Sequence, residues 1–290
     1  MKSIRPGDVS ARDFYSYMVG AVVPRPIAFV SSMSRDGKVN LSPYSFFNAF
    51  SAKPPVLVFG PVNSMRDGST KNTLDNVLEH EEVTVNIVNY NMVEQMSLAS
   101  TAYPKGINEF GKSGLTEAPA ELVKPPRVAE APVSFECKVN QVIHLGQEGG
   151  AGNLVICEVL LIHIKDEVLD EKGSINPQKL DAVGRMGGSY YCRASGEAIF
   201  ETLRPDREHG IGVDQLPEAI RKSSILTGGD LAKLANVPQL PSSADLTQYQ
   251  NEPEIKTVKA SGNTEHQHKL AQQYIRSGAT AKAWAVLLAN

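Results

Sequence analysis

The feature that most constrains the fold is a run of alternating residues from Val133 to Leu145. Apolar side chains hold the odd positions and polar ones the even positions, and only Gln141 and Val142 break the pattern. A repeat of two predicts a strand with one buried face and one exposed face. The polar members, expected on the exposed face, are Ser134, Glu136, Lys138, Asn140 and His144.

A second strand is predicted at 153–168, apolar on both faces around 155–162. The glycine-rich segment 149–152 joins it to the first, so the pair reads as a long antiparallel hairpin, suited to the wall of a barrel. Gly150-Ala151-Gly152 is not a dinucleotide fingerprint, because it links two strands and Val155 stands where the third glycine would be. A doubly wound nucleotide fold is therefore disfavoured.

The stretch 40–51 mixes aromatic rings with short polar side chains and is interrupted by Pro43. Proline lacks a backbone donor, which favours an edge strand or an irregular path. Backbone groups outside a ladder are free to bind a flat aromatic ligand with a polar rim. Before this stretch, Asp36-Gly37 is a strong turn signal, so residues 26–47 are predicted to form a β-hairpin.

Lys71 precedes a predicted helix in which Asn72 serves as the N-cap and Asp75 completes a near capping box. The free N–H groups of a helix start, together with a lysine, favour an anion such as phosphate. An ordinary surface helix with a solvated lysine is the alternative. Further on, Arg185 lies in a glycine-rich segment, where it can meet a negative charge or simply lie exposed in a turn.

These motifs together resemble the flavin reductase-like, FMN-binding split-barrel family over roughly residues 10–200. The resemblance is carried by the runs 20–28 and 40–47, by Ser51 and by Pro54-Pro55. Lys71-Asn72-Thr73 is similar to a Lys-Asp-Thr motif of that family, and the chain departs from it at Asn72, whose amide can still cap a helix.

The resemblance implies a mainly β fold with peripheral helices: an antiparallel, Greek-key-like split β-barrel over residues 1–200. It implies an oxidoreductase in which FMN accepts a hydride from NADH or NADPH and passes electrons to free flavin, a partner oxygenase or a ferric complex. A homodimer is implied as well, and no catalytic residue is assigned. The implied cofactor-binding residues are Ser31, Ser32, Ser45, Phe46, Phe47, Asn48, Ser51, Lys71, Thr73 and Arg185.

Two other functions stay open. The same pocket could hold FMN in a storage protein that has no productive nicotinamide site. Alternatively, the chain could be a β-barrel interaction module without a cofactor, whose aromatic stretch is core or interface.

Residues 201–290 are expected to form a C-terminal helical extension that packs on the barrel or on a dimer partner. Helices are predicted at 229–235, 265–277 and 280–288, with an extended segment at 238–254. The segment is too interrupted to predict an independent domain. His266 and His268 are expected to be solvated, because no third metal ligand accompanies them.

Composition restricts the expected binding partners and cellular compartment. The net charge of −3 gives no electrostatic reason to expect nucleic acid or an anionic membrane as a partner. No apolar run approaches the roughly 20 residues that a membrane span needs, and the first residues lack the apolar core of a signal peptide. The three cysteines are widely spaced, which favours a reducing cytoplasm.

Overall fold

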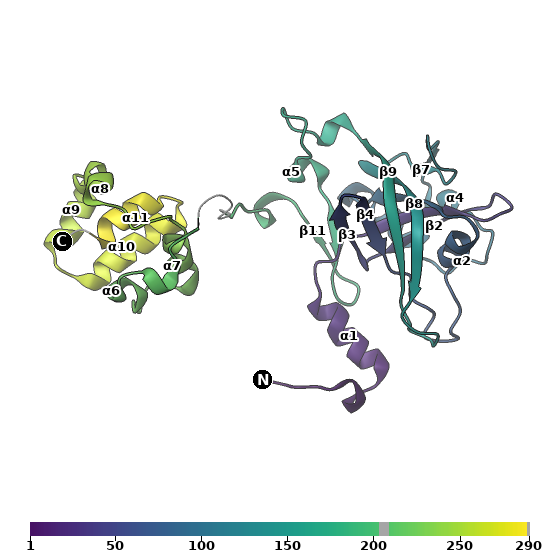
Figure 1. Ribbon diagram of the computed structural model, residues 1–290, viewed down its shortest axis with the longest axis horizontal. Helices are drawn as coiled ribbons and strands as arrows, with labels where there is room; N and C mark the ends of the chain where they lie inside the picture. Colours follow the sequence, from purple (N-terminus) through teal and green to yellow (C-terminus); the bar gives the residue numbers. More distant parts are fainter. Residues whose placement is uncertain (203–208, 289–290) are drawn as a thin grey trace. The chain divides into compact units, whose positions relative to one another are not determined.

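The computed structural model describes residues 1–202 and 209–288, and the chain divides into two compact units, Met1–Phe200 and Glu201–Asn290. The first unit, which carries all the labelled strands of Figure 1, is built on a seven-stranded antiparallel sheet. The strand order in this sheet is β2-β1-β5-β8-β9-β4-β3. Its strands are β1 (Ala28–Met33), β2 (Val39–Tyr44), β3 (Phe47–Ala52), β4 (Pro55–Phe59), β5 (Glu82–Ile87), β8 (Val133–His144) and β9 (Asn153–Ile164). Two small sheets pair β6 (Glu117–Ala118) with β7 (Arg127–Val128) and β10 (Val183–Arg185) with β11 (Tyr191–Arg193).

The predicted hairpin is confirmed: β1 and β2 pair antiparallel, with Ser31 opposite Leu41, and Gly37 has the positive φ of 81° that its turn requires. The polar–aromatic stretch is not a single arm, however. It supplies β2 at one edge of the sheet and β3 at the opposite edge, separated in sequence by only Ser45 and Phe46. Pro43 lies on the edge strand β2, as predicted for a residue without a backbone donor.

The β8–β9 hairpin is confirmed too, and its ladder shifts register between Val139 and Gln141, where the alternation breaks. The prediction that Glu136 is exposed is wrong, because its side chain is completely buried. Its carboxylate accepts the backbone N–H groups of Glu121 and Leu122 at 2.8 and 2.6 Å. It also lies 2.6 Å from His163 Nε2. These partners replace water around the buried charge.

The sheet has apolar side chains on both faces. Ala28 and Val30 of β1 face a core that includes Leu74 and Val77 of α2. Phe29, on the other face of β1, packs into a second core that α3 and α4 cover. The helices of this unit are α1 (Ala11–Ala21), α2 (Asn72–Glu79), α3 (Val93–Ala99), α4 (Glu109–Ser113) and α5 (Pro177–Leu180). The predicted mainly β class with peripheral helices is confirmed.

The second unit is helical and has a hydrophobic core of its own, centred on Trp284 and Ile275. Its helices are α6 (Glu218–Arg221), α7 (Gly228–Ala235), α8 (Ser243–Gln250), α9 (Pro253–Ala260), α10 (Thr264–Arg276) and α11 (Thr280–Leu287). Short helices joined by tight turns therefore bury enough apolar surface to form a compact unit, despite the interrupted sequence. Its packing on the barrel or on a dimer partner stays a prediction.

Two expectations for this unit are wrong. The segment predicted to be extended holds α8 and the start of α9, because Ser242 and Asp245 form a capping box that starts a helix. His268 is buried and hydrogen-bonds Ser223 Oγ at 2.7 Å, whereas His266 is exposed. Throughout 1–202 and 209–288, every helix is too short or too polar to cross a bilayer.

Candidate functional site

Helix α2 is fixed to strands β1 and β2 by two buried hydrogen bonds between side chains. Asn40 Nδ2 donates to Thr73 Oγ1 at 2.8 Å, and Asn76 Nδ2 donates to Ser32 Oγ at 3.0 Å. All four side chains are buried. The helix is therefore held at a defined place beside the strand that leads into the polar–aromatic stretch.

The start of α2 is open to an anion. Lys71, not Asn72, is the N-cap residue, and no side chain caps the helix. The predicted capping box does not form, because Asp75 instead accepts a hydrogen bond from Thr70 Oγ1 at 2.7 Å. The Lys71 side chain is exposed. An uncapped helix start with a lysine beside it leaves both donors and positive charge available to a phosphate.

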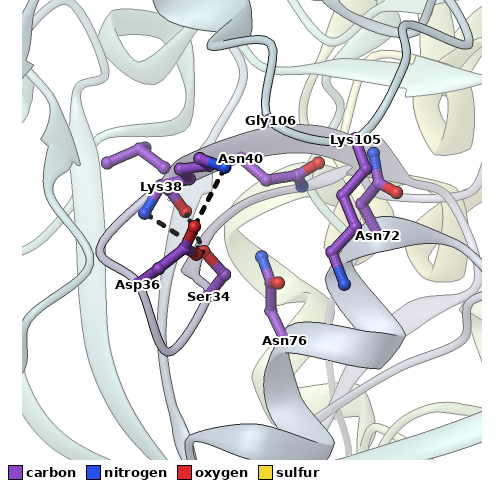
Figure 2. Close-up of a pocket in the computed structure, with 9 residues that line it drawn as sticks. Ser34, Asp36, Lys38, Asn40, Asn72, Asn76, Lys105 and Gly106 are labelled. Atoms are coloured by element: carbon purple, nitrogen blue, oxygen red, sulfur yellow. Dashed lines mark hydrogen bonds and ion pairs between the residues drawn. The ribbon is translucent and has the colours of Figure 1, made fainter.

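A cavity of about 280 Å³ lies between α2, the β1–β2 turn and the loop before α4 (Figure 2). It brings together Asn40 of β2 and Asn72 and Asn76 of α2, so the stretch and the helix share a cleft. Its lining residues are Ser34, Asp36, Lys38, Val39, Asn40, Asn72, Asn76, Lys105 and Gly106.

The other end of β2 is organised by Arg25, which sequence reasoning did not single out. Arg25 is 7% exposed as a residue, and its guanidinium donates to Ser45 Oγ at 3.3 Å and to the carbonyl oxygens of Val22 and Met186 at 2.7 and 3.2 Å. It also lies 5.9 Å from the ring centre of Phe46. No carboxylate of the described residues pairs with this buried cation.

Arg185 adds a second positive charge beside Arg25. The two residues exchange backbone hydrogen bonds of 3.0 and 2.8 Å, and the Arg185 guanidinium stacks 4.5 Å from the ring centre of Tyr191. Burial lowers the pKa of Arg25, and the charge of Arg185 lowers it further, while Tyr15 opposes both. Two neighbouring arginines that have no acidic partner in the described parts of the chain favour an anionic ligand or intermediate there.

Nine of the ten predicted site residues fall into three groups, and Ser31 lies apart from them. Ser32, Lys71 and Thr73 lie around α2, and Ser45, Phe46 and Arg185 gather around Arg25. Asn48 and Ser51 are exposed on the edge strand β3, where Phe47 packs against the inner core. Ser31 and Ser32 are neighbours on β1, so their side chains point to opposite faces of the sheet.

Sequence reasoning missed Arg25, Asn40 and Asn76. The resemblance contains the first two within its motifs, but nothing in the pattern marks them as inward-facing. Asn76 lies one helical turn after Asn72, and that spacing of four residues places both on one face of α2.

Unpaired buried atoms test whether a ligand suits this region. Ser31 Oγ, Tyr44 OH and Asn76 Oδ1 are buried without a hydrogen-bond partner among the described residues. Buried groups of this kind cost free energy unless something binds them. The backbone N–H groups of Ser45 and Phe46 also donate to no acceptor within residues 1–202 or 209–288, and because Ser45 is half-buried and Phe46 exposed, they are accessible to a ligand. The donors and charges present therefore fit a phosphorylated ligand with a polar-rimmed ring.

An antiparallel sheet whose two edge strands are joined directly, with an uncapped helix start fixed to one of them, is the architecture of a flavin-binding split barrel. The model of the family described as Flavin reductase like domain matches residues 19–183, more than half of the chain. The chain belongs to this family. The match ends two residues before Arg185 and well before the helical unit.

Relatives support the same fold. An uncharacterized protein of Aquifex aeolicus is 41% identical over 183 residues, which cover 63% of this chain and 91% of the relative. The structure of nitrilotriacetate monooxygenase component B from Bacillus cereus aligns with a TM-score of 0.64 at 29% identity, covering 70% of this chain and 98% of that one. The 2-nitrobenzoate 2-nitroreductase of Pseudomonas fluorescens gives 0.62 at 29% identity, with 70% and 96% covered.

Proposed function

We propose that this protein is an FMN-dependent oxidoreductase that takes a hydride from NADH or NADPH and passes electrons to a second acceptor. The observation that carries the proposal is the uncapped start of α2, with Lys71 beside it, fixed by hydrogen bonds to β1 and to β2, the strand that leads to Ser45 and Phe46. This arrangement offers an anion site at α2 and a ring site after β2, on two segments that hydrogen bonds tie together.

Different residues would contact the phosphate, the ribityl chain and the ring of FMN. Lys71 and the start of α2 would hold the phosphate, with Thr73, Asn48 and Ser51 toward the ribityl hydroxyls. Of the predicted serine pair, Ser32 lies on the α2 side of β1 and would be beside the ribityl chain, whereas Ser31 points to the opposite face. The backbone of Ser45, Phe46 and Phe47 would hold the ring edge. When bound, FMN supplies the two-electron chemistry, which explains why no catalytic dyad is needed. Arg25 and Arg185 would stabilise negative charge that develops at the ring end.

The acceptor and the assembly are part of the same proposal. Similarity to a monooxygenase component B supports a partner oxygenase as the second acceptor, and similarity to a nitroreductase supports a small oxidised organic molecule. A homodimer would complete the site, as the family resemblance implies. Cys137, Cys157 and Cys192 are free, in keeping with a reducing cytoplasm.

The test is the visible absorbance of the purified protein, followed by anaerobic addition of NADH or NADPH. We expect flavin bands, in the protein as purified or after FMN is added, and we expect reduced nicotinamide to bleach them. Bound flavin that no nicotinamide bleaches would favour a storage protein instead. A protein that gains no flavin absorbance on reconstitution would be a cofactor-free module, and the proposal would be wrong.

A further inference from the structure

The cavity beside α2 holds a free cation that the proposed flavin site does not use. Within the cavity, Lys38 Nζ lies 2.9 Å from Asp36, and Ser34 Oγ donates to the same carboxylate at 2.6 Å. The Ser34 hydroxyl and then Lys38 lower the pKa of Asp36 to about 2, so these two charges cancel at neutral pH. Lys105 also lines the cavity and has no hydrogen-bond or ion-pair partner among the described residues. The cavity is therefore left with one net positive charge.

Asn76 provides the second, independent sign of a ligand. Its side chain is 2% exposed, and one amide atom bonds Ser32 while the other has no partner in the described parts of the chain. Figure 2 shows this amide directed into the cavity, facing the Lys105 side. Whichever way the amide is turned, one buried polar atom faces the cavity unpaired. A ligand hydroxyl, which both donates and accepts, satisfies either orientation.

The size and lining of the cavity restrict the occupant. At about 280 Å³ it lies just below the roughly 300–1,000 Å³ of sites that hold a whole ligand, so it suits a fragment of a larger one. Val39 is its only large apolar side chain, and no aromatic ring lines it. A flat base would find no stacking surface there. A sugar with a phosphate group matches the amides, the hydroxyl and the free lysine.

We propose that this cavity binds the 2′-phosphorylated ribose of NADPH, so that Lys105 and Asn76 select NADPH over NADH. The proposal rests on the proposed oxidoreductase function and names its electron donor. Lys71 does not line the cavity, although Asn72 at the start of α2 does, so the cavity borders the site assigned to the flavin phosphate and Lys105 distinguishes the two. Asn40 lies five residues from Ser45, about 16 Å along an extended strand, which calls for a long donor such as a dinucleotide.

The loop that carries Lys105 is shaped for this role. Gly106 has a φ of 90°, and a side chain there would meet Lys38 Cδ at 3.2 Å. Only glycine adopts this conformation without strain, so it lets the loop run close over the β1–β2 turn. Lys105 is thereby placed across the cavity from Asn76, as Figure 2 shows.

The test compares two probes that differ by one phosphate, adenosine 2′,5′-bisphosphate and adenosine 5′-monophosphate, each titrated by calorimetry into the full-length protein. We expect the bisphosphate to bind at least about tenfold more tightly, the effect of one charge-assisted phosphate contact. Lys105→Ala and Asn76→Asp should each bring the two affinities to within about twofold. Lys124→Ala removes an exposed lysine that lies outside the cavity lining and should keep the full discrimination.

Kinetics and flavin binding separate the remaining outcomes. In Lys105→Ala the KM for NADPH should rise at least about tenfold more than the KM for NADH. Equal affinities for the two probes in the wild-type protein, or a preference that survives in Lys105→Ala, would overturn the inference. So would a loss of FMN affinity in that variant equal to its loss of bisphosphate affinity, because the cavity would then serve the flavin phosphate. A protein without any flavin would instead overturn the proposed function, while the probe comparison can still be read.

Discussion

The barrel unit leaves more buried side-chain polar atoms without a hydrogen-bond partner than the described part of the helical unit does. In the barrel unit Ser31, Tyr44, Asn76 and Asn89 each leave a buried side-chain atom without a partner, whereas in the described part of the helical unit only Trp284 Nε1 does so. Helix starts are mixed in both units: α1 and α4 of the barrel unit have side-chain caps, and α9 and α11 of the helical unit have none. The uncapped start of α2 is therefore a local feature of the candidate site and does not distinguish one unit from the other.

The difference in unpaired buried atoms separates a unit arranged for binding from one arranged for stability. A buried group without a partner costs about 1–3 kcal/mol, and a cap contributes about 1 kcal/mol. The barrel unit carries two of these costs, at Tyr44 of β2 and Asn76 of α2, where a ligand can recover them. The family match covers this unit alone. We therefore expect substitutions in the helical unit to change stability and those around α2 to change binding.

The largest expected effect is on the core of the helical unit. Trp284→Ala removes a fully buried indole and should cost about 3–5 kcal/mol of the free energy of unfolding of that unit. Because the barrel unit has cores of its own, flavin absorbance should persist while the helical unit unfolds. Denaturant unfolding followed by circular dichroism and by flavin absorbance measures both.

Leu240→Ala is the matched control, because Leu240 is 41% exposed and its loss should change stability by no more than about 0.5 kcal/mol. If flavin were released together with the loss of the helical signal in Trp284→Ala, the two units would unfold as one, and the expected division between a binding unit and a stability unit would be wrong.

The next effect concerns two buried carboxylates of the barrel unit. Glu136→Gln exchanges an acceptor of several N–H groups for an amide that cannot accept them all, and should cost about 2–3 kcal/mol. Glu109→Gln should cost much less, since Glu109 accepts one backbone N–H, that of Leu41, at 2.9 Å. Equal losses in the two variants would show that burial, rather than hydrogen bonding, sets the cost.

The same pair predicts a pH dependence of opposite sign. Burial raises the pKa of Glu136, but hydrogen bonds from Glu121 and His163 outweigh it and the pKa is lowered. Its contribution is therefore present above the unfolded value of about 4.3 and is lost as the pH falls through the folded pKa. Burial raises the pKa of Glu109, so its contribution is lost as the pH rises. Glu136→Gln should flatten the acid limb of the unfolding free energy, and Glu109→Gln should not.

Glu136 also shows a limit of prediction from sequence patterns, because the alternation placed this buried residue on the exposed face. The alternation from Val133 predicted the strand, because side-chain period is a local property. The register shift between Val139 and Gln141 coincides with the interruption of the pattern, whereas the shift between Glu136 and Cys137 has no counterpart in it. The alternation placed Glu136 on the open face, since nothing local reveals that residues 121–123 lie over that face and bind the carboxylate. The alternation of polar and apolar residues in a strand does not show which distant segments of the chain will cover its polar face.

In the candidate site, too, local features could be predicted from the sequence and features that depend on the whole fold could not. Lys71 and the helix it begins could be predicted from residue order, as could the turn at Gly37. The split of one polar–aromatic stretch into two opposite edge strands could not, because it depends on how the whole sheet curls. Asn76 could not be found either, because its role depends on a hydrogen bond to Ser32, which lies far away in the sequence on strand β1.

A smaller effect is expected at the start of α2, and it tests the binding side of the comparison. Lys71→Glu should weaken flavin binding at least about tenfold, or about 1.4 kcal/mol, because it replaces an attraction for phosphate with a repulsion. The free energy of unfolding without flavin should change little, since Lys71 is exposed. Flavin dissociation constants for this variant and for Lys124→Glu, an exposed control, give the answer. Unchanged retention would place the phosphate elsewhere.

The smallest effect compares one tyrosine from each unit. The Tyr44 hydroxyl is buried beside Thr73 and Ser42 without a well-formed hydrogen bond, and burial raises the pKa of Tyr44 to about 12. The Tyr274 hydroxyl of the helical unit donates to Glu254 at 3.1 Å. Without flavin, Tyr44→Phe should leave the free energy of unfolding unchanged or raise it slightly, whereas Tyr274→Phe should lower it by about 0.5 kcal/mol. A loss in Tyr44→Phe that exceeds the loss in Tyr274→Phe would mean that the barrel unit satisfies this hydroxyl without a ligand, and the proposed division between binding and stability would no longer hold at this position.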